Sequence, residues 1–237
     1  MKNGNGLIPR ILLDVHCQRD RLLARGAWCV PAASTLNRKL RELFGWAALE
    51  QVPLISINAL FPNQNPWPHR FPPHCLYHTS GARRPRFAVL PNHTTFSSKQ
   101  STDLPVDLFD QHQQAIFETT TMNPFHHTRL DRLLSQMAVG RIYVIGVGLE
   151  GAVRDLVLGL LCRNKPVTLV EDAIASDDPS DGEFARRMMR ARGAMVCTIE
   201  DLVGSSAQGR SGRTSPKRKS SQKSSPKLSR RQPLARN

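Results

Sequence analysis

Residues 141–162 read RIYVIGVGLEGAVRDLVLGLLC and decide the fold. The first seven are rich in isoleucine and valine, as expected for a strand that is buried on both faces. A glycine-rich turn, GVGLEG at 146–151, overlaps the end of this strand, and an apolar helical segment then extends to Cys162. A buried strand that turns sharply into a helix is typical of a parallel α/β sheet. In such a sheet the turn lies at the carboxyl edge, where ligands bind.

Strands and helices alternate with similar lengths on either side of this stretch. We expect strands to begin near residues 8, 53, 115, 141, 166 and 194. Helices are predicted after the glycine turn, at 34–51 with Ser34 as N-cap, at 128–139 with Thr128 as N-cap, and at 180–192. Residues 61–110 lack this rhythm and are predicted to form long loops. The predicted fold is therefore a three-layer α/β/α domain around a six-stranded, mostly parallel sheet.

Charge divides the chain into two parts. Ten of its 33 lysine and arginine residues, and none of its 19 aspartate and glutamate residues, lie in residues 204–237. That segment is rich in serine and almost free of aliphatic side chains, so it cannot bury enough apolar surface to offset the entropy cost of folding. We therefore predict a folded domain at 1–203 and a disordered basic tail at 204–237.

The cysteines and the apolar runs bear on the compartment. The five cysteines form no CxxC pair and are odd in number, which favours reduced thiols and a cytoplasmic location. No apolar run approaches the roughly 18 residues that a membrane-spanning helix needs. The first residues also lack the apolar core of a signal peptide. We therefore expect neither membrane contact nor secretion.

Six segments, taken in order, resemble one enzyme family. They are ILLDVHCQRD at 11–20, GAWCVPAASTLNRKLRELFGWAALEQVPLIS at 26–56, FPPHCLYHTSGA at 71–82, FETTTMNPFHHTRLDRLL at 117–134, IYVIGVGLEGAV at 142–153 and VTLVEDAIASDDPSDGEFARRMMRARGAMV at 167–196. Their strand, turn and helix patterns are similar to those of the isochorismatase-like cysteine hydrolases, and among these most to the nicotinamidases. The resemblance spans roughly residues 7–203 and implies the same three-layer fold.

The mechanism of that family uses an aspartate after the first strand, a lysine after the third predicted strand and a cysteine at the strand–helix turn. The resemblance places Asp14 at the aspartate position, so this residue is retained. The lysine position falls on Thr119, or on Glu118 if the loop is one residue longer, and the cysteine position falls on Ala152. Because alanine has no nucleophilic atom, the covalent mechanism of the family is not available at this position.

The backbone of the glycine turn is a further part of the family's mechanism. The resemblance assigns the oxyanion-stabilising N–H groups to Gly148 and Ala152. It also implies a cis peptide bond between Val147 and Gly148. We therefore expect the turn to keep the backbone shape of an active hydrolase although the nucleophile is absent.

The family's metal site is depleted. The nicotinamidases place an Asp-x-His pair after the second strand, where this chain has Asn58-Ala59-Leu60, and only His74 remains at a metal-binding histidine position. His69 and His78 lie near His74 in the sequence, but their spacing matches no standard closed zinc site. We therefore expect no zinc and no other cofactor, with His74 as a vestige of the metal site.

Several of these side chains also have a structural interpretation. Asp14 can cap a loop at the end of its strand, and without the lysine and the cysteine we favour a structural or ligand-binding role over a catalytic one. Cys17 could replace the missing thiol, but we favour an unreactive, partly buried cysteine. Glu150 is expected to support the turn or to lie favourably at a helix N-terminus, and the acidic run at 177–181 to form a solvated helix cap.

The basic tail is a candidate nucleic-acid contact. Its Ser-Pro-basic repeats, at 215–219 and 225–227, resemble the tails of linker histones and similar DNA-compacting proteins. Cations on a flexible chain release counterions from a polyanion, and the absence of aromatic residues predicts binding that is independent of base sequence. The alternative is a solubilising extension. The residues expected to contact phosphate are Lys217, Arg218, Lys219, Lys223, Lys227, Arg230 and Arg231.

Three functions remain open on the sequence alone. The first, which we favour, is a catalytically degenerate isochorismatase/nicotinamidase-like domain, a pseudoenzyme that acts as a binding or scaffold protein. The second is an active hydrolase of amide C–N or related bonds that uses water positioned by Asp14. The third is a nucleic-acid-associated protein whose folded domain serves as an oligomerisation platform. The expected partners are thus a small-molecule ligand, nucleic acid without sequence preference, and a second copy of the chain.

Overall fold

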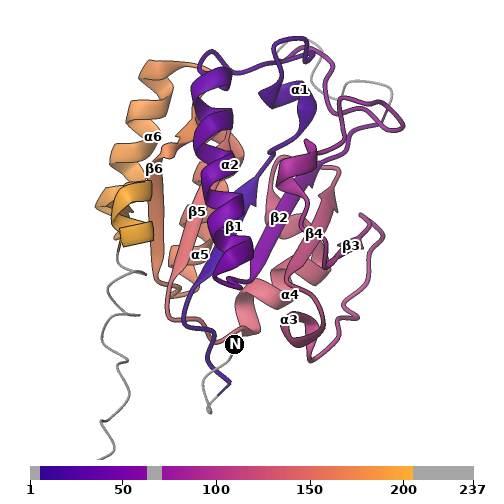
Figure 1. Ribbon diagram of the computed structural model, residues 1–237, viewed down its shortest axis with the longest axis vertical. Coiled ribbons are helices and arrows are strands. Elements are labelled where there is room, and N and C mark those ends of the chain that lie inside the picture. Colours follow the sequence, from indigo (N-terminus) through magenta and orange to yellow (C-terminus); the bar gives the residue numbers. More distant parts are fainter. Residues whose placement is uncertain (1–5, 63–70, 205–237) are drawn as a thin grey trace, which may run out of the picture.

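The computed structural model describes residues 6–62 and 71–204, which form one sheet with helices on both sides (Figure 1). Its strands are β1 (Ile11–Val15), β2 (Leu54–Ala59), β3 (His93–Phe96), β4 (Gln114–Thr119), β5 (Ile142–Val147), β6 (Val167–Ala175) and β7 (Met195–Cys197). Its α-helices are α1 (Arg19–Leu22), α2 (Ala33–Leu49), α3 (Leu108–Gln111), α4 (Thr128–Gln136), α5 (Arg154–Cys162) and α6 (Pro179–Ala191). Within these ranges, no helix is long and apolar enough to cross a bilayer. The predicted tail lies outside the described residues from 205 onwards, including all the side chains expected to contact phosphate.

All neighbouring strands pair in parallel, in the order β3–β4–β2–β1–β5–β6–β7. The predicted three-layer α/β/α fold is therefore confirmed, and six strands begin within three residues of their predicted starts. The number of strands was wrong, because β3 lies in the region predicted to form loops. This strand is at the edge of the sheet, and its four residues, HTTF, are all exposed or half-buried. It therefore lacks the apolar run that marks a buried strand.

Two predicted helix caps were also wrong. Helix α2 begins at Ala33, so Ser34 lies inside it and is exposed. Helix α4 is capped by His127, whose side chain accepts from the Leu130 N–H. The Thr128 hydroxyl instead donates to the Ser101 carbonyl oxygen at 2.6 Å, so it fastens a neighbouring loop to the start of the helix.

The core lies on both faces of the sheet. Helix α2 covers one face, together with Ile199 and Leu202 from the helical turn at 199–204. Helices α4, α5 and α6 contribute to the core on the other face. Because both faces are covered, β1 and β2 are buried along their whole length.

The order of the strands defines a switch point between β1 and β5. From β1 the chain proceeds first to β2, β3 and β4 on one side and only then to β5, β6 and β7 on the other. In open α/β sheets, ligands bind outside the carboxyl ends of the strands at such a point. In Figure 1 this is the upper edge of the sheet, on the side of α1.

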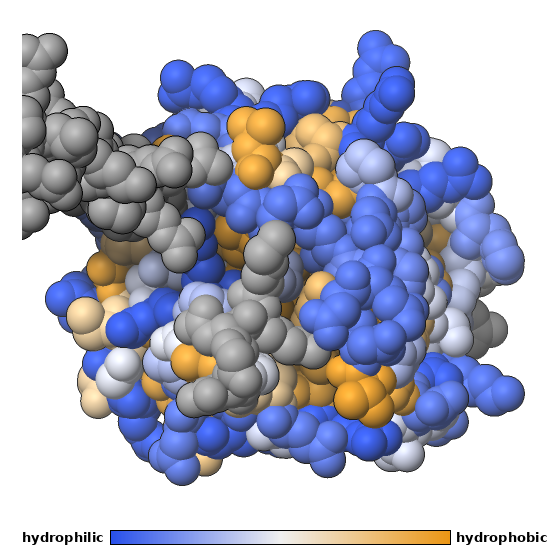
Figure 2. All heavy atoms as spheres, turned by 60° about the horizontal axis from the view of Figure 1, so that its bottom comes forward, coloured by the Kyte–Doolittle hydropathy of each residue, from blue (hydrophilic) through white to orange (hydrophobic). Residues whose placement is uncertain are grey.

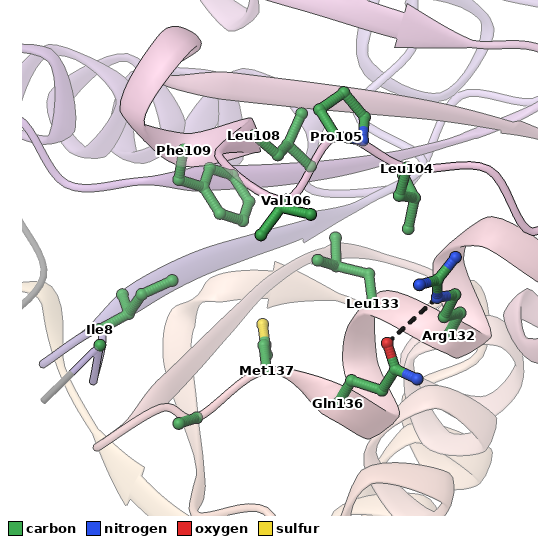
Figure 3. A pocket seen from close by; sticks show the side chains of 12 residues that line it. Ile8, Leu104, Pro105, Val106, Leu108, Phe109, Arg132, Leu133, Gln136 and Met137 are labelled. Atoms are coloured by element: carbon green, nitrogen blue, oxygen red, sulfur yellow. Dashed lines mark hydrogen bonds between the residues drawn. The ribbon is translucent and has the colours of Figure 1, made fainter.

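The opposite end of the sheet, where the strands begin, contains a different kind of cavity. It has a volume of about 360 Å³ and is lined mainly by apolar side chains, among them Leu104, Val106 and Leu133 (Figure 3). Its polar rim includes Arg132, whose Nε donates to Gln136 Oε1 at 3.1 Å. Figure 2, with this end brought forward, shows small hydrophobic patches separated by hydrophilic side chains.

Candidate functional site

A cavity of about 370 Å³ lies at the switch point. Residues that follow β1, β5 and β6 contribute to its walls, including His16, Ala152 and Asp177. Of the three predicted catalytic positions, the structure brings only Ala152 to this cavity. Asp14 lies in the sheet below and is fully buried, and Thr119 belongs to a smaller pocket on the other side of β4.

Two glycines shape the turn between β5 and α5. Gly146, with a φ of 125°, lies so close to β1 that a Cβ atom here would be 2.1 Å from the Val15 carbonyl oxygen. Gly148, with a φ of 81°, then begins the π-helical turn η3 (Leu149–Val153). The peptide bond between Val147 and Gly148 is trans, so the predicted cis bond was wrong. The left-handed conformation of Gly148 redirects the chain instead.

Three N–H groups of this turn donate to carbonyl oxygens of the protein itself. The Gly148 N–H donates to the Ala175 carbonyl oxygen at 3.0 Å, which extends the pairing of β5 with β6. The N–H groups of Gly151 and Val153 both donate to the Gly148 carbonyl oxygen, at 3.0 and 3.1 Å. A substrate oxyanion would therefore compete with Ala175 for the Gly148 N–H. Ala152 is one of the residues that line the cavity, and it is fully buried.

Asp14 is the centre of a buried polar cluster. Its Oδ1 accepts from Arg84 Nη2 at 2.5 Å, and its Oδ2 accepts from the Ser56 hydroxyl. Arg84 also donates from Nη1 to Asn58 Oδ1 at 2.7 Å and from Nε to the Ala88 carbonyl oxygen at 2.8 Å. The Asp14 and Arg84 side chains are 0% and 3% exposed. Both carboxylate oxygens of Asp14 are therefore held inside the protein by these partners.

Arg84 is the cation that sequence reasoning missed. It comes from the irregular segment before the 3₁₀ turn Arg86–Ala88, where nothing in the sequence distinguishes it from Arg83 and Arg86. The predicted lysine position, Thr119, uses its hydroxyl to donate to the Thr121 carbonyl oxygen at 3.2 Å. Thus the positive charge beside Asp14 comes from a different part of the chain and not from the segment after β4.

Arg21 forms another wall of the cavity. Its Nη2 donates to both carboxylate oxygens of Asp177, at 2.6 and 2.7 Å, and its Nη1 donates to the Trp28 carbonyl oxygen at 2.8 Å. Its guanidinium carbon lies 3.7 Å from the centroid of the Trp28 ring, in a cation–π contact. Asp177 is therefore an ion-pair partner and not a solvated cap, whereas Asp178 does cap α6 as predicted.

Glu150 supports the turn, as predicted from the sequence. Its Oε1 accepts from the Asp177 N–H at 2.7 Å and from the Asp178 N–H at 2.8 Å, so it joins the turn after β5 to the loop after β6. Its Oε2 is buried and has no hydrogen-bond partner in the described part of the chain. The carboxylate is therefore fixed through one oxygen only.

His16 and Cys17 are both buried where β1 ends. Burial lowers the pKa of His16 to about 3, with further contributions from Arg21, His74 and Arg84, so its ring is neutral near pH 7. Its Nε2 has no partner among residues 6–62 and 71–204, although the residue lines the cavity and is only 5% exposed. Burial, and secondarily the charge of Asp14, raise the pKa of Cys17 well above its usual value. Cys17 is therefore a protonated thiol and a poor nucleophile.

Too few metal-ligating side chains lie around His74 in residues 6–62 and 71–204 to form a cluster of three. Its Nδ1 lies 2.8 Å from the Pro72 carbonyl oxygen, and its ring packs edge-on against Trp28. Asn58, at the position of the lost Asp-x-His pair, is bound to Arg84. Outside the undescribed segment 63–70, which contains His69, no three histidine, cysteine, aspartate or glutamate side chains are grouped as metal ligands.

Comparisons with known proteins point to one family. The isochorismatase domain family matches residues 10–201. A pyrazinamidase of Pyrococcus horikoshii, solved in complex with zinc, matches with a TM-score of 0.63 and 24% identity over 80% of this chain and 99% of that chain. An isochorismatase-like hydrolase from Alkaliphilus metalliredigens matches with a TM-score of 0.66 and 17% identity over 83% and 98% of the two chains.

A more distant structural neighbour is the MAR1 ribonuclease from Caenorhabditis elegans, with a TM-score of 0.53 and 17% identity over 83% of this chain and 80% of that one. No curated protein sequence gives a significant match. At these identities the structural likeness establishes the fold, while the match to the family carries the assignment of the chain. The resemblance seen in the sequence is thereby confirmed at the level of the family.

Proposed function

The chain belongs to the isochorismatase family, and we propose that it is a catalytically degenerate member that binds a small molecule without hydrolysing it. The observation that carries this proposal is Ala152. It occupies the position of the nucleophile and lines the cavity, yet it offers only a methyl group. A covalent hydrolase needs a thiolate or an equivalent nucleophile within reach of the substrate carbonyl.

The state of Asp14 supports the same proposal. A general base must lie within hydrogen-bond reach of the proton that it removes. Here the Asp14 carboxylate is fully buried, and its oxygens accept hydrogen bonds from Arg84 and Ser56. Asp14 also does not line the cavity, so the alternative of water activated by Asp14 gains no support from this geometry.

Cys17 is a poor substitute for the missing thiol. It is fully buried, and its raised pKa keeps it protonated near neutral pH. The cavity has a volume of about 370 Å³, which is within the range of small-molecule pockets. A pocket that offers no reactive thiol is better suited to binding than to covalent chemistry.

The test is an assay of amide hydrolysis by the purified full-length chain. We expect no release of ammonia from nicotinamide or benzamide above the buffer rate, and no difference between the wild type and Cys17→Ser. Turnover by the wild type would overturn the proposal. If Cys17→Ser abolished that turnover, Cys17 would be the replacement nucleophile.

We infer a second function from the tail, which has ten basic and no acidic residues. Binding of duplex DNA through phosphates alone gives a slope of log K against log salt of about −0.9 per neutralised phosphate. Engagement of half of the ten cations would therefore give a slope of roughly −4 to −5. The test compares the full chain with a chain that ends at Val203 in a salt titration. Equal affinity of the two would leave the tail as a solubilising extension.

A further inference from the structure

Two polar atoms in the walls of the 370 Å³ cavity have no hydrogen-bond partner among the described residues. They are Nε2 of His16 and Oε2 of Glu150, and both are buried. Buried polar groups in native proteins are nearly always paired, so each orphaned atom needs an explanation. Because both residues line the same cavity, one ligand in that cavity could supply both partners.

The charges around the cavity favour a positive ligand. The acidic side chains that line it are those of Glu150, Asp177, Asp178 and Asp181, and the basic one is that of Arg21. Arg21 is already paired with Asp177. Burial lowers the pKa of His16 to about 3, so its ring adds no charge near pH 7. The walls therefore carry an excess of negative charge.

Aromatic side chains on one wall of the cavity could pack against the apolar part of such a ligand. The rings of Trp28 and Phe71 have centroids 4.6 Å apart, and both residues line the cavity with Met122. The Arg21 guanidinium already covers one face of the Trp28 ring. The remaining aromatic surface can bury the apolar part of a ligand.

The fixed position of the Glu150 carboxylate determines where the charged group of the ligand would bind. Its Oε1 is anchored by the N–H groups of Asp177 and Asp178, so the carboxylate cannot rotate freely to find another donor for Oε2. An ammonium group that reached Oε2 would form a charge-assisted hydrogen bond. The neutral His16 ring offers a single further hydrogen-bonding atom, Nε2, to a second polar group of the ligand.

We propose that the cavity binds a small organic cation, a protonated primary amine with an apolar body, whose ammonium group donates to Glu150 Oε2. This inference rests on the proposed binding function and names its class of ligand. A neutral amide or alcohol of the same shape would leave the excess of negative charge in the walls uncompensated. Such a ligand should therefore bind more weakly.

The experiment compares benzylamine with its neutral analogue benzyl alcohol, by isothermal titration calorimetry on the full-length chain near neutral pH and at low salt. We expect benzylamine to bind roughly tenfold or more tightly, as a hydrogen bond to a charged group implies. Glu150→Gln keeps Oε1 and its two anchoring bonds but replaces Oε2 with an amide nitrogen. That variant should lose the preference for benzylamine. The matched control is Glu183→Gln on α6, where the carboxylate pairs with Arg186 on the surface, and it should retain the preference.

The proposal is overturned if benzylamine binds no more tightly than benzyl alcohol, or if Glu150→Gln binds benzylamine as the wild type does. Should Glu150→Gln fail to fold by circular dichroism, the salt dependence of the wild type decides. Affinity for benzylamine must fall with added salt while that for benzyl alcohol stays constant, and equal salt dependence overturns the proposal. Hydrolysis of an amide by the wild type would refute the proposed function alone, because it leaves the preference for a cation untouched.

Discussion

The Asp14 cluster and the neighbouring cavity each contain a residue that the resemblance places at a catalytic position, yet they differ in how their buried polar atoms are paired. In the cluster, both carboxylate oxygens of Asp14 are paired, with Arg84 and with Ser56. In the cavity, His16 and Glu150 each retain a buried polar atom without a partner in the described part of the chain. Pairing within the protein stabilises the fold, whereas an unpaired atom at a cavity leaves a place for a ligand. We therefore assign a structural role to the Asp14 cluster and a binding role to the cavity.

The largest effect is expected from breaking the cluster. Arg84→Met leaves the Asp14 carboxylate buried without its cation, which typically costs about 3–5 kcal/mol. The measurement is urea unfolding followed by circular dichroism. Arg86→Met, at an exposed position in the same segment, is the control and should change the free energy of unfolding by less than about 0.5 kcal/mol.

The double variant Asp14→Asn/Arg84→Met sharpens this test. Because it removes the buried negative charge together with its partner, it should lose less stability than the two single changes add up to. Additive losses, or a loss below about 1 kcal/mol for Arg84→Met, would contradict the structural role of the cluster.

An intermediate effect is expected at the turn that forms the cavity wall. Gly148→Ala meets no atom within 4 Å and should cost only the left-handed backbone, about 1–2 kcal/mol. Gly146→Ala places a Cβ against the Val15 carbonyl oxygen, so β1 and β5 would have to separate. We expect a loss of about 3 kcal/mol there, again from urea unfolding. Equal losses of unfolding free energy in the two variants would contradict the close contact of Gly146 with the Val15 carbonyl oxygen of β1.

A smaller effect concerns the pH dependence of His16. Its pKa is about 3 in the folded state and 6.5 in its ordinary state, so below pH 6.5 the unfolded chain binds a proton that the folded chain does not. Stability should therefore fall as the pH falls from 6.5 towards 3, by about 2 kcal/mol between about pH 7 and about pH 5. The groups that act on His16 are Arg21, His74 and Arg84.

The check is the stability of His16→Asn at both pH values. Asparagine tolerates the left-handed backbone of this position, where φ is 53°, and has no group that titrates. The variant should lose about 2 kcal/mol less than the wild type on acidification. His126→Asn, at an exposed histidine, should behave as the wild type does. The same acid sensitivity in His16→Asn as in the wild type would contradict a neutral, buried His16.

The fold was predictable because burial leaves a periodic trace in the sequence. The central strands are covered on both faces, so they appear as continuous apolar runs, and their starts were predicted closely. Edge strand β3 leaves no such trace, since its side chains are exposed or half-buried. The caps of α2 and α4 failed for a related reason. A hydroxyl near a helix start can bind elsewhere, as Thr128 does with Ser101.

The positions of Asp14 and Ala152 came from the resemblance to the family, which matches the sequence around β1 and around the turn after β5. Of the two, Ala152 lines the cavity. The partners that determine what Asp14 does, above all Arg84, come from an irregular segment 70 residues away along the chain. The same holds for Arg21 and Asp177, which are 156 residues apart. Such pairs depend on tertiary packing and have no local pattern that sequence reasoning can use.

The most direct test of the account is amide hydrolysis by Ala152→Cys. This variant places a thiol at the predicted nucleophile position while leaving Asp14 bound to Arg84. If Asp14 is structural, its buried carboxylate does not serve the new thiol as a general base, and the variant should release no more ammonia from nicotinamide than the wild type does. Turnover by Ala152→Cys would contradict the account, because it would show that Asp14 is still able to act as the base and that only the thiol was missing.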